Sequence, residues 1–275
     1  METKAENKCF GGTQGVYSHA SKATGTDMTF GLFLPEDANS GPVPVLWFLS
    51  GLTCTHKNAM TKAGAQAWAA EQGLAVVFPD TSPRGEDVAD DDAYDLGKGA
   101  GFYLDATESP WSRHFKMQSY ILDDLTELIF QNFALDDTRQ SITGHSMGGH
   151  GALTLAAKSP GRFRSVSAFS PICNPTESDW GKKQFQAYFG SVEAGKAHDA
   201  TCLIDQSGLN IPLLIDTGTD DQFGDLLKTE ALTETLARRR VASNVRPQKG
   251  YDHSYFFVST FMSDHVDFHS EALWA

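Results

Sequence analysis

Length, composition and charge restrict the class of protein before any motif is considered. The chain has 275 residues, 40% of them hydrophobic, which suffices for one domain (residues 1–275) with a buried sheet covered by helices. Its 22 basic and 35 acidic residues give a net charge of −13, so nucleic acid and anionic membranes are not expected as partners. No long apolar run occurs, residues 1–7 are polar, and the four cysteines form no C-x-x-C pair. We expect a cytoplasmic protein with free thiols.

The first third of the chain predicts strands followed by a β–α–β unit. Apolar positions alternate over residues 8–21 and 27–34, a pattern typical of antiparallel strands. A nearly continuous apolar strand is expected at 43–49, an alanine-rich helix at 57–72 and a second buried strand at 74–78. From residue 43 onwards, strands and helices therefore alternate.

The middle of the chain combines a long irregular segment with the strongest motif. Residues 79–110 contain glycines, prolines and an acidic run, and a loop of that length usually covers a functional site. Helical apolar spacing follows at 115–133, and then an apolar strand at 140–143 leads into a small-residue helix at 149–157. The next buried strand is expected at 166–169.

The last third continues the same alternation. A second irregular excursion is expected over 171–210, followed by a strand at 211–215, a helix at 225–240, a last strand at 244–248 and a final helix at about 254–274. Strands that alternate with helices predict a mostly parallel, doubly wound sheet with helices on both faces. The predicted architecture is the α/β-hydrolase fold.

The nucleophile is predicted from the sequence Gly-His-Ser-Met-Gly at residues 144–148, a match to G-x-S-x-G. The motif lies between the strand at 140–143 and the helix at 149–157, which is the expected context of a nucleophile elbow. A serine at the tip of that turn has strained backbone angles, and the flanking glycines let strand and helix approach closely. Ser146 is therefore the predicted nucleophile.

The general base and the acid must follow Ser146 in this architecture. His253 lies on a loop between the last strand and the last helix, where an imidazole can reach the serine. For the acid, the end of the preceding strand offers Asp216, Asp220 and Asp221 within six residues. Asp216 is still in strand phase, whereas the other two lie on the loop, so the residues alone leave the choice open.

Two further histidines, His265 and His269, are four residues apart on the final helix. That spacing can hold a metal ion, but no third ligand is evident and a solvated helix face is the commoner arrangement. We expect no metal or organic cofactor.

The oxyanion hole requires two amide donors that point at the developing negative charge. The N–H of Met147, the residue after the nucleophile, supplies one. The other is expected from the loop after the strand at 43–49, where Leu52 is our choice.

The residues and motifs resemble those of one family over nearly the whole chain, the S-formylglutathione hydrolases, also called the esterase D family. The resembling segments run in order and include both irregular excursions: 51–55, 79–85, 99–103, 144–152, 167–175, 180–183, 220–223 and 250–255. The resemblance implies that Ser146 is the nucleophile, Asp221 the acid and His253 the base, with Leu52 and Met147 as oxyanion donors. It thereby decides between the three aspartates. Thr217 and Gly224 depart from the family's usual residues, but neither is a triad position.

Three further residues are expected to contact the substrate. Cys54 lies beside the oxyanion loop, where the family also has a cysteine, and a small buried apolar role is the alternative for it. Trp180 and Phe102 are candidates for closing the acyl side of the pocket, with core packing as the alternative for both. Five basic residues are candidates for meeting the carboxylates of glutathione, or are simply solvated: Lys57, Arg84, Lys98, Lys182 and Lys183.

The activity that the resemblance implies is hydrolysis of S-formylglutathione to glutathione and formate, which belongs to formaldehyde detoxification. The partners expected are a small-molecule glutathione thioester and, for assembly, a second copy in a homodimer. Three alternatives share these residues: a broad short-chain carboxylesterase, an acyltransferase, and a non-catalytic binding protein on the same fold.

Overall fold

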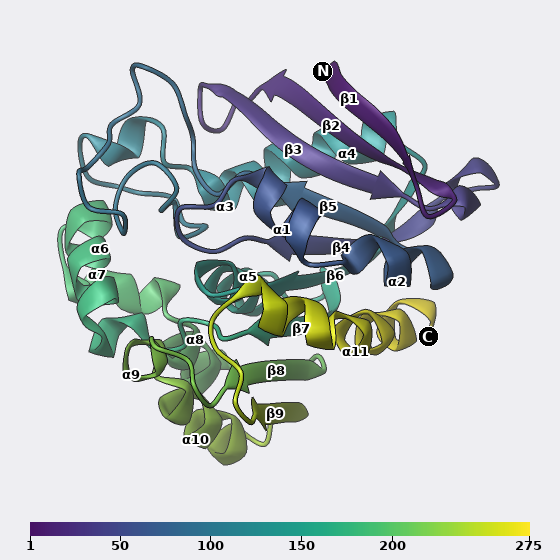
Figure 1. Ribbon diagram of the computed structural model, residues 1–275. Coiled ribbons are helices and arrows are strands. Elements are labelled where there is room, and N and C mark those ends of the chain that lie inside the picture. Colours follow the sequence, from purple (N-terminus) through teal and green to yellow (C-terminus); the bar gives the residue numbers. More distant parts are fainter.

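The computed structural model describes residues 1–275 and contains one nine-stranded sheet with the strand order β1-β2-β3-β5-β4-β6-β7-β8-β9 (Figure 1). The strands are β1 (Glu2–Cys9), β2 (Gly12–Ala20), β3 (Asp27–Leu34), β4 (Val43–Leu49), β5 (Ala75–Pro79), β6 (Leu135–Gly144), β7 (Phe163–Phe169), β8 (Leu213–Gly218) and β9 (Ser243–Gln248). Strands β1 to β3 pair in antiparallel fashion and β3 also pairs antiparallel with β5, whereas all pairs from β5 to β9 are parallel. The parallel strands therefore have their carboxyl ends at one edge, where a site can form.

Helices cover both faces of this sheet, as the alternating sequence pattern predicts. The α-helices are α1 (His56–Lys62), α2 (Ala65–Glu71), α3 (Met117–Ser119), α4 (Thr126–Asn132), α5 (Met147–Lys158), α6 (Asp179–Phe189), α7 (Val192–Gly195), α8 (Ala200–Ser207), α9 (Gly224–Leu227), α10 (Thr229–Arg239) and α11 (Tyr255–Trp274). A π-helical segment, η3 (Tyr120–Leu125), joins α3 to α4, and short 3₁₀ turns are η1 (Glu36–Asn39), η2 (Trp111–Arg113), η4 (Pro175–Glu177) and η5 (Lys196–His198). No helix is long and apolar enough to cross a membrane.

The sheet separates two hydrophobic cores. On one face, α1, α2 and α11 pack on the smaller core, which contains Ala59, Ala69 and Phe257 (Figure 1). On the other face, α4, α5, α8 and α10 pack on the larger core. Strand β4 reads as a continuous apolar run because all seven of its residues are buried between the two layers. The predicted α/β-hydrolase architecture is confirmed.

Three element predictions need correction. The helix expected at 57–72 is two helices, since the chain leaves helical geometry at Gly64 (φ 71°). The excursion at 171–210 is not irregular, because it contains α6, α7 and α8, which lie together at one end of the molecule (Figure 1). Strand β1 begins earlier than the extended segment predicted at 8–21, and its residues are almost all exposed. An edge strand that buries no face carries no alternating apolar signal.

The long segment after β5 is irregular, as predicted, with no helix or strand before η2. It is nevertheless well anchored, because its aromatic residues Phe102 and Tyr103 are buried in the larger core. Tyr188 of α6 fixes its middle through two hydrogen bonds, accepting from the Gly97 N–H and donating to the Ala100 carbonyl. The segment therefore forms a fixed wall at the carboxyl edge of the sheet.

His265 and His269, expected on a solvated face of the last helix, are completely buried against the sheet. The His269 ring is hydrogen-bonded to Ser165 and Ser167, each at 2.8 Å, and His265 to Ser167 at 2.8 Å. No group of histidine, cysteine and carboxylate side chains in the structure has the geometry of a metal site. The two histidines connect α11 to β7, and the expectation of a solvated face is wrong.

Candidate active site

Ser146 lies at the turn between β6 and α5 with backbone angles φ 58° and ψ −118°. A positive φ is a strained conformation for serine and is typical of a nucleophile elbow. Gly144 and Gly148 permit the turn, because a Cβ atom on either would lie about 2 Å from a backbone carbonyl oxygen, of Gly148 (2.2 Å) and Leu49 (2.0 Å) respectively. The side chain is thus presented at the amino end of a helix.

His253 and Asp221 are brought together by the loops that follow β9 and β8. His253 Nδ1 donates to Asp221 Oδ2 at 2.6 Å, and both side chains are at most 10% exposed. Burial alone would raise the pKa of Asp221, but the hydrogen bonds from His253 and from the Phe223 N–H lower it below its ordinary value. The carboxylate is therefore ionised and fixes the imidazole with Nε2 free to face the cavity.

The other two candidate acids have different environments. Asp216 is completely buried at the end of β8 and accepts two hydrogen bonds from the guanidinium of Arg246, each at 2.6 Å. Burial raises the pKa of Asp216, but its hydrogen bonds with His265 and Arg246 lower the value to about 2. Asp220 is exposed and accepts from the hydroxyl of its neighbour Thr219. Only Asp221 contacts the histidine beside the serine.

The loop after β4 lies opposite the elbow. A Cβ atom on Gly51 would lie 3.2 Å from Ser146 Cβ, so the two backbones are in close contact. The Leu52 N–H donates to no protein acceptor. Met147 is the first residue of helix α5, so its N–H has no acceptor within the helix. The loop is held by hydrogen bonds from Tyr103 Oη to the Ser50 carbonyl (2.8 Å) and from Thr53 N–H to the Gly99 carbonyl (2.9 Å). Two unpaired donors therefore flank the serine.

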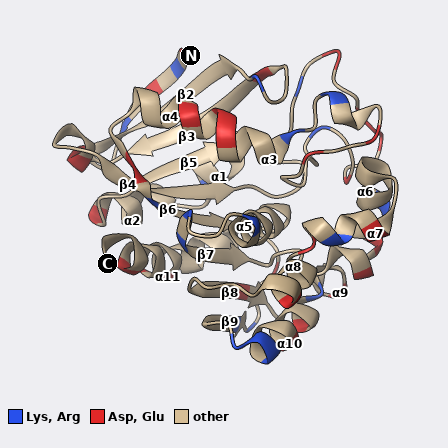
Figure 2. Ribbon diagram, turned by 180° about the vertical axis from the view of Figure 1, so that it is seen from behind, with Lys and Arg blue, Asp and Glu red and all other residues tan.

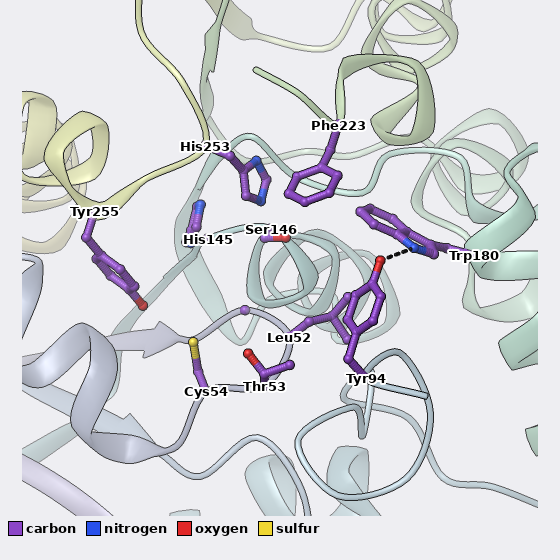
Figure 3. Close-up of a pocket in the computed structure, with 11 residues that line it drawn as sticks. Leu52, Thr53, Cys54, Tyr94, His145, Ser146, Trp180, Phe223, His253 and Tyr255 are labelled. Atoms are coloured by element: carbon purple, nitrogen blue, oxygen red, sulfur yellow. Dashed lines mark hydrogen bonds between the residues drawn. The ribbon is translucent and has the colours of Figure 1, made fainter. Parts of the chain in front are cut away.

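A cavity of about 250 Å³ opens over the serine (Figure 3). Eleven residues line it: Gly51, Leu52, Thr53, Cys54, Tyr94, His145, Ser146, Trp180, Phe223, His253 and Tyr255. Of the three predicted substrate contacts, Cys54 and Trp180 belong to this lining. Phe102 does not, because it is completely buried and packs against His150 in the larger core. The expectation that Phe102 walls the acyl pocket is wrong.

Aromatic side chains form one end of the cavity. Trp180 Nε1 donates to Tyr94 Oη at 3.0 Å, which joins helix α6 to the long segment after β5 (Figure 3). Phe223 lies between them and the catalytic loop, with its ring centre 5.0 Å from the rings of both Trp180 and His253. Tyr94 and Phe223 were not predicted as wall residues. Tyr94 follows an acidic run that gives no apolar periodicity, so the sequence contained no signal for it.

His145, the residue before the serine, was likewise not predicted as part of the site. Its ring lies 4.6 Å from the ring of His253 and 5.3 Å from that of Tyr255. Burial, and then repulsion from the neighbouring His253, lowers the pKa of His145 to about 3. The ring is therefore neutral at physiological pH and adds no charge beside the base.

Of the ionisable groups considered as substrate contacts, Cys54 is neutral and most of the basic residues are paired. Burial raises the pKa of the Cys54 thiol, so Cys54 is protonated at neutral pH. Three of the five basic residues considered as glutathione contacts have carboxylate partners; the pairs are Arg84 with Asp80, Lys98 with Asp90 and Lys183 with Asp95. Lys57 and Lys182 are exposed and have no such partner.

The site combines three features around one small cavity: a strained serine, a histidine bound to a carboxylate, and two free amide donors. On this sheet, these features define a serine hydrolase of the α/β-hydrolase fold. The model of the Esterase family matches residues 21–268. An S-formylglutathione hydrolase of Paracoccus denitrificans is 63% identical over 273 residues, which cover 99% of this chain and 98% of that protein. The chain belongs to the S-formylglutathione hydrolase family.

Other relatives extend the same match. A mouse S-formylglutathione hydrolase is 49% identical, with 98% of this chain and 97% of that protein covered. The solved structure of an S-formylglutathione hydrolase from Agrobacterium tumefaciens superimposes with a TM-score of 0.97 at 47% identity, covering 99% of this chain and 100% of that chain. The relatives match over their full length, so the site loops are included in the likeness.

Proposed function

We propose that this chain hydrolyses S-formylglutathione to glutathione and formate, with Ser146 as nucleophile, His253 as general base and Asp221 as the acid that orients it. The observation that carries the proposal is the 2.6 Å hydrogen bond between His253 and Asp221 at the cavity that holds Ser146. The family membership supplies the substrate, since the relatives at 63% and 49% identity are named for it.

In the first half-reaction, His253 Nε2 takes the proton of the Ser146 hydroxyl as the oxygen attacks the formyl carbon. The carbonyl oxygen becomes an oxyanion, which accepts hydrogen bonds from the N–H groups of Leu52 and Met147. The carbon–sulfur bond then breaks and glutathione leaves as the thiol, protonated by His253. Asp221 stabilises the histidine cation throughout this half-reaction.

In the second half-reaction, water attacks the formyl ester on Ser146 while His253 accepts the water proton. The same two amides stabilise the second tetrahedral intermediate, formate leaves, and the serine regains its proton from the histidine. The chain's own residues supply every proton transfer, and the reaction needs no metal or organic cofactor.

The size of the cavity agrees with a small acyl group. A formyl group has only hydrogen beyond its carbonyl, so nearly all substrate binding must come from the thiol half. The end lined by Trp180 and Tyr94 would then face the acyl group (Figure 3). The single-domain organisation, the cytoplasmic location and the homodimer stay predictions, to be checked by limited proteolysis, fractionation and light scattering.

The proposal is tested by steady-state kinetics on S-formylglutathione beside p-nitrophenyl acetate. We expect a kcat/KM for the thioester at least about a hundredfold above that for the ester, because only the thioester has the glutathionyl group to bind. Ser146→Ala should lower kcat at least about a thousandfold for both substrates while leaving Tm nearly unchanged. Ser159→Ala, at the far end of α5, is the control. Equal rates on both substrates would instead favour a general short-chain esterase.

A further inference from the structure

The cavity over Ser146 has no group that can recognise the charges of a glutathionyl moiety. That tripeptide carries two carboxylates, whereas none of the eleven lining residues is a lysine or an arginine. At about 250 Å³, the cavity is also smaller than most pockets that enclose a whole ligand. Because the whole protein has a net charge of −13, an anionic substrate needs a local cation to be held. The carboxylates must therefore bind outside this cavity.

A second cavity of about 480 Å³ adjoins the first. It is lined by Lys62, Ser254, Tyr255, Phe256 and Ser259, and Tyr255 also lines the catalytic cavity. The two sides come from the end of α1 and the start of α11, helices that pack against each other. The two cavities therefore share one lining residue, Tyr255.

Lys62 is the cation of this second cavity. It is exposed, forms no ion pair or side-chain hydrogen bond, and lies 6.0 Å from the centre of the Tyr255 ring. By contrast, Arg84, Lys98 and Lys183 already have carboxylate partners. An unpaired ammonium group can bind a carboxylate without first breaking an ion pair.

Phe256 adds an apolar surface to the same cavity. Its side chain is 87% exposed, the largest exposed fraction among the exposed large hydrophobic residues of the chain. It directly follows Tyr255 in the first turn of α11, three residues after the catalytic histidine. An exposed aromatic side chain beside a free cation fits a ligand that carries both methylene groups and a carboxylate.

The position of the two ends of the catalytic cavity gives the direction of the substrate. Figure 3 shows Trp180 and Tyr94 on one side of Ser146, and Tyr255 with Cys54 on the other. On the first side, a hydrogen bond joins Trp180 to Tyr94, and the lining there is aromatic and uncharged. On the second side, His145 lies against Tyr255 (5.3 Å between ring centres), and Lys62 lies 6.0 Å from the same tyrosine ring. The second side therefore has a cation next to the residue that both cavities share.

We infer that the second cavity is the subsite for the glutathionyl group, with Lys62 binding one of its carboxylates and Phe256 packing on its methylene groups. This inference rests on the proposed function for its substrate. The subsite selects anionic thiol leaving groups of peptide size over neutral ones. It explains how a site made for an acyl group of one carbon obtains its binding energy.

The test compares Lys62→Gln with the wild-type protein on S-formylglutathione and on p-nitrophenyl acetate. We expect the ratio of kcat/KM for the thioester to kcat/KM for the ester to fall about fivefold, through a higher KM for the thioester. Lys182→Gln is the matched comparison, an equally exposed lysine on the helix that carries Trp180. An unchanged ratio for Lys62→Gln, or an equal fall for Lys182→Gln, overturns the inference.

A second measurement separates this inference from the proposed function. Glutathione should inhibit p-nitrophenyl acetate hydrolysis, and Lys62→Gln should weaken that inhibition about fivefold. Glutathione with both carboxyls esterified should inhibit the wild-type and variant proteins equally. If the wild-type protein fails to hydrolyse S-formylglutathione, the proposed function is wrong, and glutathione inhibition still decides the subsite. An inhibition constant for glutathione that Lys62→Gln leaves unchanged would reject the subsite.

Discussion

Asp216, Asp220 and Asp221 are the same residue type within six positions, yet each has a different environment. Asp216 is in strand phase, so its carboxylate is buried and pairs with Arg246 on the neighbouring strand β9. Asp220 and Asp221 follow the strand, and the turn there directs one side chain to solvent and the other to His253. Burial and partner, rather than sequence position, decide which carboxylate can stabilise a histidine cation.

This difference gives a prediction for the two adjacent loop aspartates. Asp221→Asn should lower kcat about a thousandfold or more, because the amide carries no charge to stabilise the His253 cation and can hold the wrong tautomer. Asp220→Asn should change kcat less than about twofold, because its side chain is exposed and contacts only Thr219. The measurement is kcat for S-formylglutathione hydrolysis with both variants at the same pH.

The matched change at neighbouring positions controls for effects on the loop itself. Thermal unfolding should show that both variants keep the wild-type Tm to within a few degrees, since neither substitution changes side-chain volume. A larger loss of kcat in Asp220→Asn than in Asp221→Asn would transfer the acid role to Asp220.

At the residue scale, the sequence predicted the serine and the histidine from motif and order alone. It could reduce the acid to three candidates, and the family resemblance selected the one that the structure pairs with His253. Phe102 shows the limit of such reasoning, because an aromatic residue in a site-covering segment can face either the cavity or the core. Nothing in a single sequence records which way a loop side chain points.

At the element scale, prediction succeeded where burial leaves a period in the sequence. Strands β4 and β5 are buried on both faces and therefore read as apolar runs. Strand β1 is exposed and polar, so only its pairing with β2 makes it a strand. Helices α6 and α8 bury apolar residues such as Phe185 and Ile204 in the larger core. Glycines end each of them after a few turns, at Gly190 and Gly208, so the excursion does not read as one long periodic segment.

Helix α11 buries two histidines, His265 and His269, beside the apolar residues that it contributes to the smaller core. Burial lowers the pKa of both His265 and His269. Asp216 acts in the opposite direction on the pKa of His265, but burial has the larger effect. Both rings are therefore neutral in the folded state. The unfolded chain binds protons at these histidines below their ordinary pKa of about 6.5, whereas the folded protein does not. The stability that comes from keeping these two histidines neutral is therefore fully present above this pH. It is lost as the pH falls below it.

We predict that the free energy of unfolding decreases from pH 7.5 to 5.5, and that His269→Gln makes this decrease smaller by about 1.4 kcal/mol. The variant should be less stable at pH 7.5, because a glutamine cannot replace both serine hydrogen bonds of the ring. Asp216 does not contribute in this window, since its pKa of about 2 affects stability only below the ordinary aspartate value. The measurement is urea unfolding at the two pH values.

Ser270→Ala on the same helix is the control for a loss of stability without a change in bound protons. Its hydroxyl donates to Gln72, so its removal also costs a hydrogen bond between elements. The free energy of unfolding of Ser270→Ala should depend on pH as that of the wild-type protein does. If His269→Gln has the same pH dependence as Ser270→Ala, His269 is not the group that stays neutral.

At the scale of the whole molecule, the cavity is assembled from segments that are distant in the chain. The loop after β4, the segment after β5, the elbow, helix α6 and the loops after β8 and β9 each contribute at least one lining residue. The acidic residues that set the net charge are spread over many elements instead of forming one patch (Figure 2). Fold class and triad order could be predicted from local patterns, but a wall such as the Tyr94–Trp180 pair depends on the folded arrangement of two excursions.

This wall leads to a prediction about acyl-chain length. The Trp180 and Tyr94 side chains, joined by a hydrogen bond, line one end of a cavity of about 250 Å³, so we expect a longer acyl chain to meet their rings. For p-nitrophenyl esters we expect kcat/KM to fall about tenfold or more from acetate to butyrate, and further to hexanoate. Trp180→Ala should flatten the series by opening that end. Phe102→Leu, which changes the core without lining the cavity, should keep the wild-type slope.

The sign of the trend is what distinguishes a formyl site from a general esterase. In an open apolar pocket each methylene contributes favourable burial of about 0.8 kcal/mol, so rates would rise along the series and Trp180→Ala would have little effect. In the cavity over Ser146, we expect the same methylene to meet the hydrogen-bonded rings of Trp180 and Tyr94, and the energy of displacing them to exceed the gain from burial. Rates that increase towards hexanoate in the wild-type protein would therefore show that Trp180 does not close the acyl side. The narrow acyl specificity inferred from the cavity would then have to be abandoned.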